Sequence, residues 1–275
     1  MHTARRACLA AALAFALASS AHAKDPRDLV IGTSAGPYAN QVKYGIKPIL
    51  ERQGYRVKVV EFNDYIQPNF ALAEGSLDAN VFQHSIYLNK FARDHKLALS
   101  ALVTIPTAPI AIYSRKHRSL DEARAGTTVA LPNDPTNQAR ALVMLEQLGW
   151  LQLRPNTDPV KASERDIARN LRGVKLLPLE AAQLPRALQD ADYAFVNGNY
   201  ALASGLKLTD ALRTERISQN YVNLVAVRTA DLDKPFARDI AAAYRSRDFL
   251  AWTVQHNPGY AKTDYQLAML GQKAQ

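Results

Sequence analysis

The stretch from Tyr65 to Leu88, with Asn63 and Asp64 directly before it, brings together the side chains best suited to holding a small molecule. Amides, carboxylates and one imidazole stand among four aromatic rings, without the regular polar and apolar alternation of a helix or strand. Such a mixture suits the wall of a pocket that grips a small, zwitterionic and partly apolar molecule, in a carrier or an enzyme; an irregular core is the alternative. The polar members are Asn63, Asp64, Gln67, Asn69, Asp78, Asn80, Gln83 and His84, and the rings are those of Tyr65, Phe70, Phe82 and Tyr87.

A second group lies at the start of an expected helix over residues 135–148. Asp134 is a good helix N-cap, and Pro135 suits the first helical position. Arg140 then falls in the second turn, where a cation opposes the helix dipole at a cost of about 0.3–1 kcal/mol. Such a cation either pairs with a carboxylate at the surface or points into a cleft and holds a ligand carboxylate through a bidentate fork. Spacing alone does not decide between these two interpretations.

The elements that must position these residues alternate between strand and helix patterns. This alternation predicts an α/β protein with mostly parallel sheets. With 275 residues, the chain is long enough for one large domain or two medium ones. The expected strands are 28–32, 56–62, 77–82, 97–104, 110–113, 127–131, 174–177, 193–196 and 222–227. The expected helices are 38–53, 86–94, 135–148, 181–188 and a terminal set within 235–254.

Polar clusters follow five of the expected strands. In α/β sheets, ligands bind outside the carboxyl ends of the strands. Any one cluster is ordinary turn chemistry, but five at the same kind of end predict a shared binding site. The clusters are Gly32–Gly36, Asn63–Tyr65, Gln83–His84, Pro132–Asn137 and Asn197–Tyr200.

The first 23 residues have the features of a secretory signal peptide. Arg5 and Arg6 precede an apolar run, residues 7–17, that is shorter than the roughly 20 residues of a membrane-spanning helix, and residues 21–23 form an A-x-A cleavage site. An uncleaved membrane anchor is the alternative, which the short run disfavours. The only cysteine, Cys8, lies inside this segment, so the mature chain would lack disulfides and a lipid-bearing cysteine. We expect a periplasmic protein that is not lipid-anchored.

Charge and motifs disfavour nucleic-acid binding and catalysis. Without the signal peptide, 32 basic and 25 acidic residues give a net charge of +7, and the two signs are interleaved rather than gathered on one face. The sequence has no GxSxG elbow, HExxH motif or P-loop, and the histidines of the mature chain are scattered without metal-ligand spacing. We therefore expect no nucleic-acid partner, no catalytic residue, no metal and no cofactor.

Long motifs along the chain match the pattern of one protein family. They are EFNDYIQPNFALAEGSLDANVFQHSIYL, PIAIYSRKHRSLDE, VALPNDPTNQARALVMLEQLGW, ERDIARN, AAQLPRALQDADYAFVNGNYALASGL and NYVNLVAVR. They cover nearly the whole mature chain in the family's order, and the strings QPNxAL, DANxFQH and PNDPTNxxRAL are long and specific. The chain resembles substrate-binding proteins of the MetQ/NlpA type, the methionine-binding components of ABC importers.

The resemblance implies a periplasmic-binding-protein fold, type II-like, in which two α/β lobes enclose the ligand. We expect residues 1–23 to be the signal peptide, residues 24–111 plus 224–275 the first lobe, and residues 112–223 the second. The chain would cross between lobes near Ile110–Ser114 and near Asn220–Val225, and the lobes would close by a hinge motion. The implied partners of this expected monomer are methionine and a permease in the inner membrane.

The resemblance also assigns seven ligand-binding positions. Arg140 falls on the position that neutralises the ligand carboxylate, and two asparagines would offer amide groups to the ammonium and the carboxylate. Three rings would form an apolar slot for a thioether, which packs well against ring edges. His84 either donates to the carboxylate or shapes the slot, in a protonation state that the sequence leaves open. The seven are Tyr65, Phe82, His84, Tyr87, Arg140, Asn197 and Asn223.

Two loops depart from the family's usual pattern. Ser85 and Ile86 stand before Tyr87 where the family often has a proline, and residues 218–221 replace the usual Ser-Pro-Tyr. The ligand therefore stays open among methionine, its D-enantiomer, an oxidised form, a methionine dipeptide and another amino acid. A surface adhesion or sensor-docking role is a further alternative. The absence of a lipobox is another departure, because family members are commonly lipoproteins.

Overall fold

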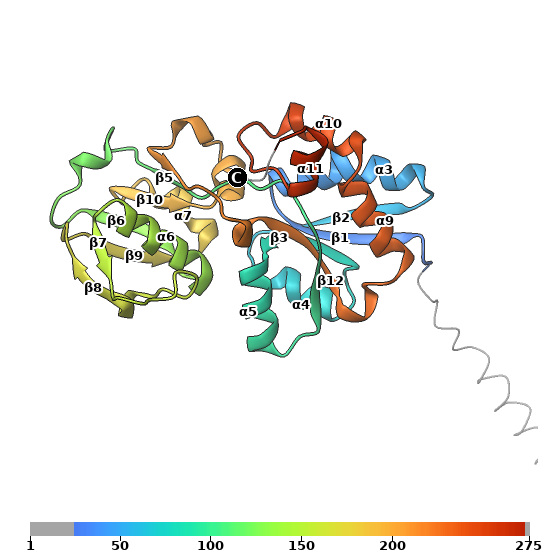
Figure 1. Ribbon diagram of the computed structural model, residues 1–275, viewed down its shortest axis with the longest axis horizontal. Helices are drawn as coiled ribbons and strands as arrows, with labels where there is room; N and C mark the ends of the chain where they lie inside the picture. Colours follow the sequence, from blue (N-terminus) through green and yellow to red (C-terminus); the bar gives the residue numbers. More distant parts are fainter. Residues whose placement is uncertain (1–24, 273–275) are drawn as a thin grey trace, which may run out of the picture.

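The computed structural model describes residues 25–272, which form two lobes side by side, each built on a five-stranded sheet (Figure 1). The predicted signal peptide, with Cys8, lies outside the described residues. No helix within residues 25–272 is long and apolar enough to cross a membrane.

The first sheet combines strands from both ends of the chain, in the order β2-β1-β3-β12-β4. β1 pairs in parallel with β2 and β3, whereas β12 runs antiparallel to both of its neighbours. Four of the five strands therefore point in one direction. The strands are β1 (Asp28–Ser34), β2 (Arg56–Phe62), β3 (Ala79–His84), β4 (Leu99–Thr104) and β12 (Asn223–Arg228).

The second sheet is built from the middle of the chain, in the order β11-β5-β10-β6-β9. β6 pairs in parallel with β10 and β9, and β5 is the strand that runs against its neighbours. An antiparallel pair, β7 (Leu151–Leu153) and β8 (Ile167–Asn170), forms a separate small sheet. The prediction of an α/β protein with mostly parallel sheets is confirmed. The strands are β5 (Ala111–Tyr113), β6 (Thr128–Pro132), β9 (Lys175–Leu179), β10 (Tyr193–Val196) and β11 (Arg213–Thr214).

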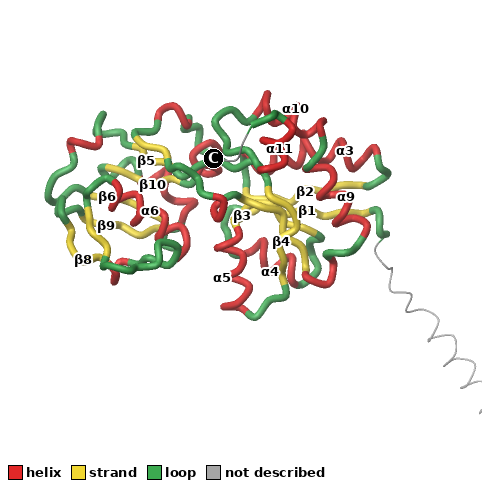
Figure 2. The backbone as a smooth tube through the Cα atoms, viewed as in Figure 1, coloured by secondary structure: helices red, strands yellow, loops and turns green. Residues whose placement is uncertain are grey.

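Helices surround both sheets (Figure 2). They are α2 (Pro37–Asn40), α3 (Lys47–Arg52), α4 (Gln67–Ala73), α5 (Ser85–His95), α6 (Pro135–Gln147), α7 (Leu184–Ala187), α8 (Gly198–Ala203), α9 (Pro235–Tyr244), α10 (Arg247–His256) and α11 (Asp264–Met269). A π-helical segment, η1 (Gln41–Ile46), joins α2 to α3. Short 3-10 turns are η2 (Leu120–Glu122), η3 (Glu164–Asp166), η4 (Ala181–Gln183), η5 (Leu208–Asp210), η6 (Gln219–Tyr221) and η7 (Thr229–Asp231).

The first sheet separates two hydrophobic clusters because successive strand residues point to opposite faces. Leu29 and Ile31 pack into the cluster that contains the inner faces of η1, α3, α9 and α10. Val30, between them, packs into the cluster formed with Leu72 of α4 and Leu88 of α5. Burial on both faces explains why these strands read as nearly continuous apolar runs.

Several short elements differ from the sequence-based prediction. The helix expected over residues 38–53 is a continuous helical run with a π-helical centre, where Gly45 allows close packing: a Cβ there would lie 2.8 Å from the ring of Phe249. Helices α4, α8 and α11 and strands β7, β8 and β11 were not predicted. Each has seven residues or fewer, too few to show a clear period.

Two chain segments cross between the lobes and are tied together. The first, residues 105–110, joins β4 to β5, and the second, residues 215–222, joins β11 to β12. The Ile105 amide donates to the Asn223 carbonyl at 2.7 Å, and the Asn223 amide donates to Oγ1 of Thr107 at 2.7 Å. Thr107 also pairs through its backbone with Ala261. The crossings therefore form one hydrogen-bonded junction between the lobes.

Candidate ligand-binding cleft

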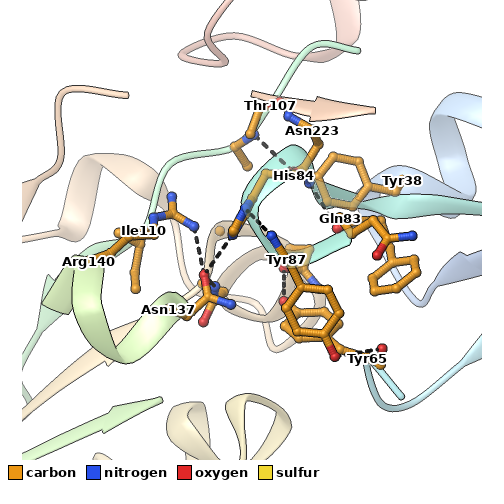
Figure 3. A pocket seen from close by; sticks show the side chains of 15 residues that line it. Tyr38, Tyr65, Gln83, His84, Tyr87, Thr107, Ile110, Asn137, Arg140 and Asn223 are labelled. Atoms are coloured by element: carbon orange, nitrogen blue, oxygen red, sulfur yellow. Dashed lines mark hydrogen bonds between the residues drawn. The ribbon is translucent and has the colours of Figure 1, made fainter. Parts of the chain in front are cut away.

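A pocket lies between the lobes and is lined by side chains from both of them (Figure 3). All seven residues assigned from the family resemblance line it. Four of them come from the loop after β2, from β3 and from α5, and Asn223 begins β12, all in the first lobe. Arg140 on α6 and Asn197 after β10 come from the second lobe. The carboxyl ends of strands in both lobes therefore meet at this pocket, and four of the five predicted polar clusters contribute to its lining. The cluster Gly32–Gly36 does not line it, which corrects the prediction of one site shared by all five.

Three aromatic rings form one side of the pocket. The rings of Tyr65 and Phe82 stack with centroids 5.6 Å apart, and Tyr87 meets both edge-on at 6.1 and 6.0 Å. The Tyr87 hydroxyl donates to the Tyr65 carbonyl at 2.9 Å, which fixes the two rings relative to each other. Burial raises the pKa of both tyrosines, so both stay neutral donors. This side offers an apolar surface with fixed ring edges.

His84 is buried at the junction of β3 and α5, and its protonation state follows from its contacts. Its Nδ1 accepts a hydrogen bond from the Tyr87 amide at 3.2 Å, which caps α5. Burial, with a smaller effect from the Arg140 guanidinium, holds the pKa of His84 well below its usual value. The ring is therefore neutral, with its proton on Nε2, 3.4 Å from Oδ1 of Asn137.

Arg140 is buried, with 5% of its side chain exposed, and forms an ion pair with Glu215. Asp134 caps α6 by accepting from the Asn137 amide, as predicted, and this start of the helix places Arg140 in the pocket wall. Burial lowers the pKa of Arg140, but the charge of Glu215 and its hydrogen bonds to the guanidinium, with smaller effects from two tyrosines, together raise this pKa above its usual value. The ring of Tyr221 lies 4.6 Å from the guanidinium carbon. The interpretation of Arg140 as a surface residue is therefore wrong. Arg140 does pair with a carboxylate, but this ion pair is buried and the arginine lines the pocket.

The side-chain oxygen of Asn137 is the point on which three donors converge. It accepts from Nη1 of Arg140 at 2.8 Å, and Nε2 of His84 lies 3.4 Å away (Figure 3). It also accepts from Nδ2 of Asn197 at 3.1 Å. Asp134 fixes this orientation, because its Oδ2 accepts from Nδ2 of Asn137 at 2.9 Å. Asn137 therefore holds the side chains of Arg140, Asn197 and His84 in fixed positions in the pocket wall.

The two predicted asparagines, Asn197 and Asn223, differ in the hydrogen bonds that their side chains make. Asn223 is anchored by donating from Nδ2 to the Phe82 carbonyl at 2.9 Å. Asn197 is 6% exposed, and its Oδ1 has no hydrogen-bond partner among residues 25–272. A buried, unpaired carbonyl oxygen is costly, and a ligand N–H or ammonium would satisfy it.

Sequence reasoning missed three residues that shape the pocket. Asn137 lies inside the quoted PNDPTN motif, and Asn199 inside the polar cluster after β10, so both carried a signal. Glu215, 75 residues from Arg140 along the chain, carried none. Among the described residues, no group of three or more His, Cys, Asp or Glu is placed to hold a metal ion.

Comparison with known proteins gives a consistent family and fold. The model of the NlpA lipoprotein family matches residues 29–263. The D-methionine-binding lipoprotein MetQ of Salmonella typhi is 38% identical over 226 residues, which are 81% of this chain and 83% of that protein.

Two solved structures extend this similarity to three dimensions. A nutrient-binding protein from Burkholderia cenocepacia, solved bound to methionine, is 39% identical and superposes with a TM-score of 0.81 over 86% of this chain and 99% of that one. A periplasmic substrate-binding protein of an ABC transporter from Coxiella burnetii is 36% identical, with a TM-score of 0.80 over 86% of this chain and all (100%) of that one. The predicted two-lobed binding-protein fold is confirmed by these structures.

Proposed function

Because this chain belongs to the NlpA lipoprotein family, we propose that it is the solute-binding component of an ABC importer and that its ligand is methionine. The relatives are substrate-binding proteins rather than enzymes, and we extend that role to this chain. The observation that carries the proposal is the placement of seven family-matched side chains around one pocket between the lobes.

The chemistry of the pocket supports a zwitterionic ligand with an apolar side chain. The ligand carboxylate binds at Arg140, beside the proton on Nε2 of His84. The ammonium binds near Oδ1 of Asn197, the acceptor that has no partner among the described residues. The thioether lies between the rings of Tyr65, Phe82 and Tyr87, where a polarisable sulfur contacts ring edges.

Opening and closing of the two lobes would admit and enclose the ligand. We keep the lobe boundaries predicted from sequence, residues 24–111 plus 224–275 and residues 112–223. Strand membership supports them to within one residue at each boundary, because β5, in the second sheet, begins at Ala111 and β12, in the first sheet, begins at Asn223. The junction around Thr107 would act as the hinge.

The proposed site of action is the periplasm. The predicted signal peptide would be cleaved after residue 23, and the mature monomer would deliver methionine to an inner-membrane permease. Because the only cysteine is Cys8, within that segment, we propose that this protein acts without the lipid anchor that its relatives' names indicate. Labelling of the mature protein by a fatty-acid probe would contradict this part of the proposal.

A thermal-shift screen on protein refolded free of endogenous ligand tests the function. A ligand that binds only the folded state stabilises it by about 2.7 kcal/mol at about 100 times its Kd. We expect methionine to raise the Tm, and parallel samples with D-methionine, methionine sulfoxide and a methionine dipeptide to rank these forms. A shift with lysine or glutamate, and none with any methionine compound, would reject methionine as the ligand.

A further inference from the structure

The carboxylate of Glu215 holds Arg140 from outside the pocket. Glu215 lies at the start of the second crossing, and 7% of its side chain is exposed. Its Oε2 accepts from Nε of Arg140 at 3.1 Å, and its Oε1 accepts from Nη2. Arg140 lines the pocket and Glu215 does not. The pair is therefore placed to orient the arginine without occupying the space for a ligand.

The remaining hydrogen-bonding capacity of Arg140 fits one more carboxylate. A guanidinium has five N–H donors in a planar fork. Glu215 takes two of them, and Oδ1 of Asn137 takes one from Nη1. One donor on Nη1 and one on Nη2 stay without a partner among the described residues. These two adjacent nitrogens have the spacing that the two oxygens of a carboxylate bridge.

The second crossing restrains the guanidinium in two directions. Glu215 bonds its edge, and the ring of Tyr221, on the same segment, covers its face at 4.6 Å. Glu215 is itself fixed to the first crossing, because its Oε1 accepts from the Ile110 amide at 2.8 Å and its own amide donates to the Ile110 carbonyl at 3.1 Å. The position of Arg140 is thus tied to the junction between the lobes.

The ion pair also leaves the pocket without net charge. Arg140 is the only lysine, arginine, aspartate or glutamate among the described residues that line the pocket, and Glu215 balances it. An uncompensated charge in a buried site is unfavourable, whereas a zwitterion adds none. The arrangement therefore suits a ligand with one carboxylate, one ammonium and an uncharged side chain.

We propose that Glu215 is a positioning residue of this cleft, which presents the two remaining N–H donors of Arg140 to the ligand carboxylate and keeps the pocket neutral. This inference rests on the proposed function, because it assumes an amino-acid ligand. It assigns to Glu215 a role in affinity without direct contact with the ligand.

The test compares three variants with the wild type by calorimetric titration of refolded, ligand-free protein with L-methionine. Glu215→Gln removes the charge and keeps the shape, and Glu215→Ala leaves space for a small carboxylate. The matched control is Glu51→Gln, which removes the exposed ion pair of Lys47 and Glu51 on α3, 3.6 Å apart. We expect Glu215→Gln to weaken binding about tenfold or more, and Glu51→Gln to leave it within about twofold.

Chemical rescue separates positioning from a purely structural role. Acetate should restore part of the methionine affinity of Glu215→Ala, because its carboxylate can replace that of Glu215, and chloride at the same ionic strength should not. Where Glu215→Gln fails to fold, Glu215→Asp, which keeps the charge with a shorter reach, should show the loss of affinity.

The possible outcomes are distinct. Wild-type affinity in Glu215→Gln, or no rescue by acetate, would overturn the inference. Tighter binding by Glu215→Gln would also overturn it, because Glu215 would then be competing with the ligand for Arg140. A wild-type protein that binds no methionine would instead reject the proposed function.

Discussion

The hydroxyl of Tyr65 donates a 2.6 Å hydrogen bond to the side-chain oxygen of Asn199 across the pocket, from the first lobe to the second. The Tyr65 ring also packs against Tyr200 of α8, with centroids 5.0 Å apart. Tyr65, one of the three rings of the aromatic slot, is therefore also part of the contact between the lobes. Ligand binding and lobe closure share this side chain.

Tyr65→Phe should weaken methionine binding while preserving the slot. The ring remains, but the bond to Asn199 is lost, and Asn199 is left with a buried oxygen that lacks a donor. We expect a loss of about 1–3 kcal/mol of binding free energy by calorimetry. Tyr44→Phe, on a side chain that is 63% exposed, is the matched control. Equal affinities for all three proteins would show that the bond does not stabilise the closed lobes.

Arg140→Ala should weaken methionine binding by about 2–5 kcal/mol, because the ligand carboxylate would lose its buried, charged partner. Arg52→Ala provides the control, since Arg52 forms an exposed pair with Asp248 at 2.5 Å. Circular dichroism of both variants checks the fold, because Arg140→Ala also leaves Glu215 unpaired. Unchanged calorimetric affinity in folded Arg140→Ala would refute the assignment of Arg140 to the carboxylate.

The buried imidazole of His84 should make the folded state sensitive to acid. Because its pKa in the folded protein lies well below 6.5, the unfolded chain takes up a proton first as the pH falls. The stabilisation is complete above about pH 6.5 and is lost below it, by up to about 1.4 kcal/mol per pH unit.

His84→Asn keeps an acceptor for the Tyr87 amide and removes this titration. Urea unfolding between about pH 7 and about pH 5 should show a steeper loss of unfolding free energy in the wild type than in His84→Asn. Parallel pH dependences would mean that His84 is protonated equally in the folded and unfolded states.

Norleucine, in which a methylene replaces the sulfur, should bind more weakly than methionine but still measurably. The slot formed by Tyr65, Phe82 and Tyr87 accepts either chain, and the difference isolates sulfur–ring contacts worth about 0.3–1.5 kcal/mol. Competition calorimetry measures it, with lysine as the charged control. Lysine binding as tightly as norleucine would contradict an apolar slot in a neutral pocket.

The sequence was most informative where local chemistry decides the structure. Asp134 and Pro135 correctly predicted the start of α6, because a cap and a proline act within one turn. The polar clusters after strands predicted a site at the strand ends, because parallel strands bring those ends together. The seven positions taken from the motifs all line one pocket. Their binding roles stay a prediction.

Contacts between distant segments had no local signal. The partner of Arg140 is 75 residues away, and no spacing rule connects Glu215 to it. The neutral state of His84 depends on its burial and, to a smaller degree, on the charge of Arg140, which comes from the other lobe. Helix α4 was not predicted because its seven residues are too few to show a helical period, and the helix is stabilised by the packing of Leu72.

The most direct test of the central claim is a crystal structure of the unlabelled protein with L-selenomethionine, with the selenium located by anomalous scattering. The account predicts one strong peak in the cleft, between the rings of Tyr65, Phe82 and Tyr87, with the ligand carboxylate on the two remaining N–H donors of Arg140. A selenium peak beside Arg140, or full occupancy at a site outside this cleft, would contradict it.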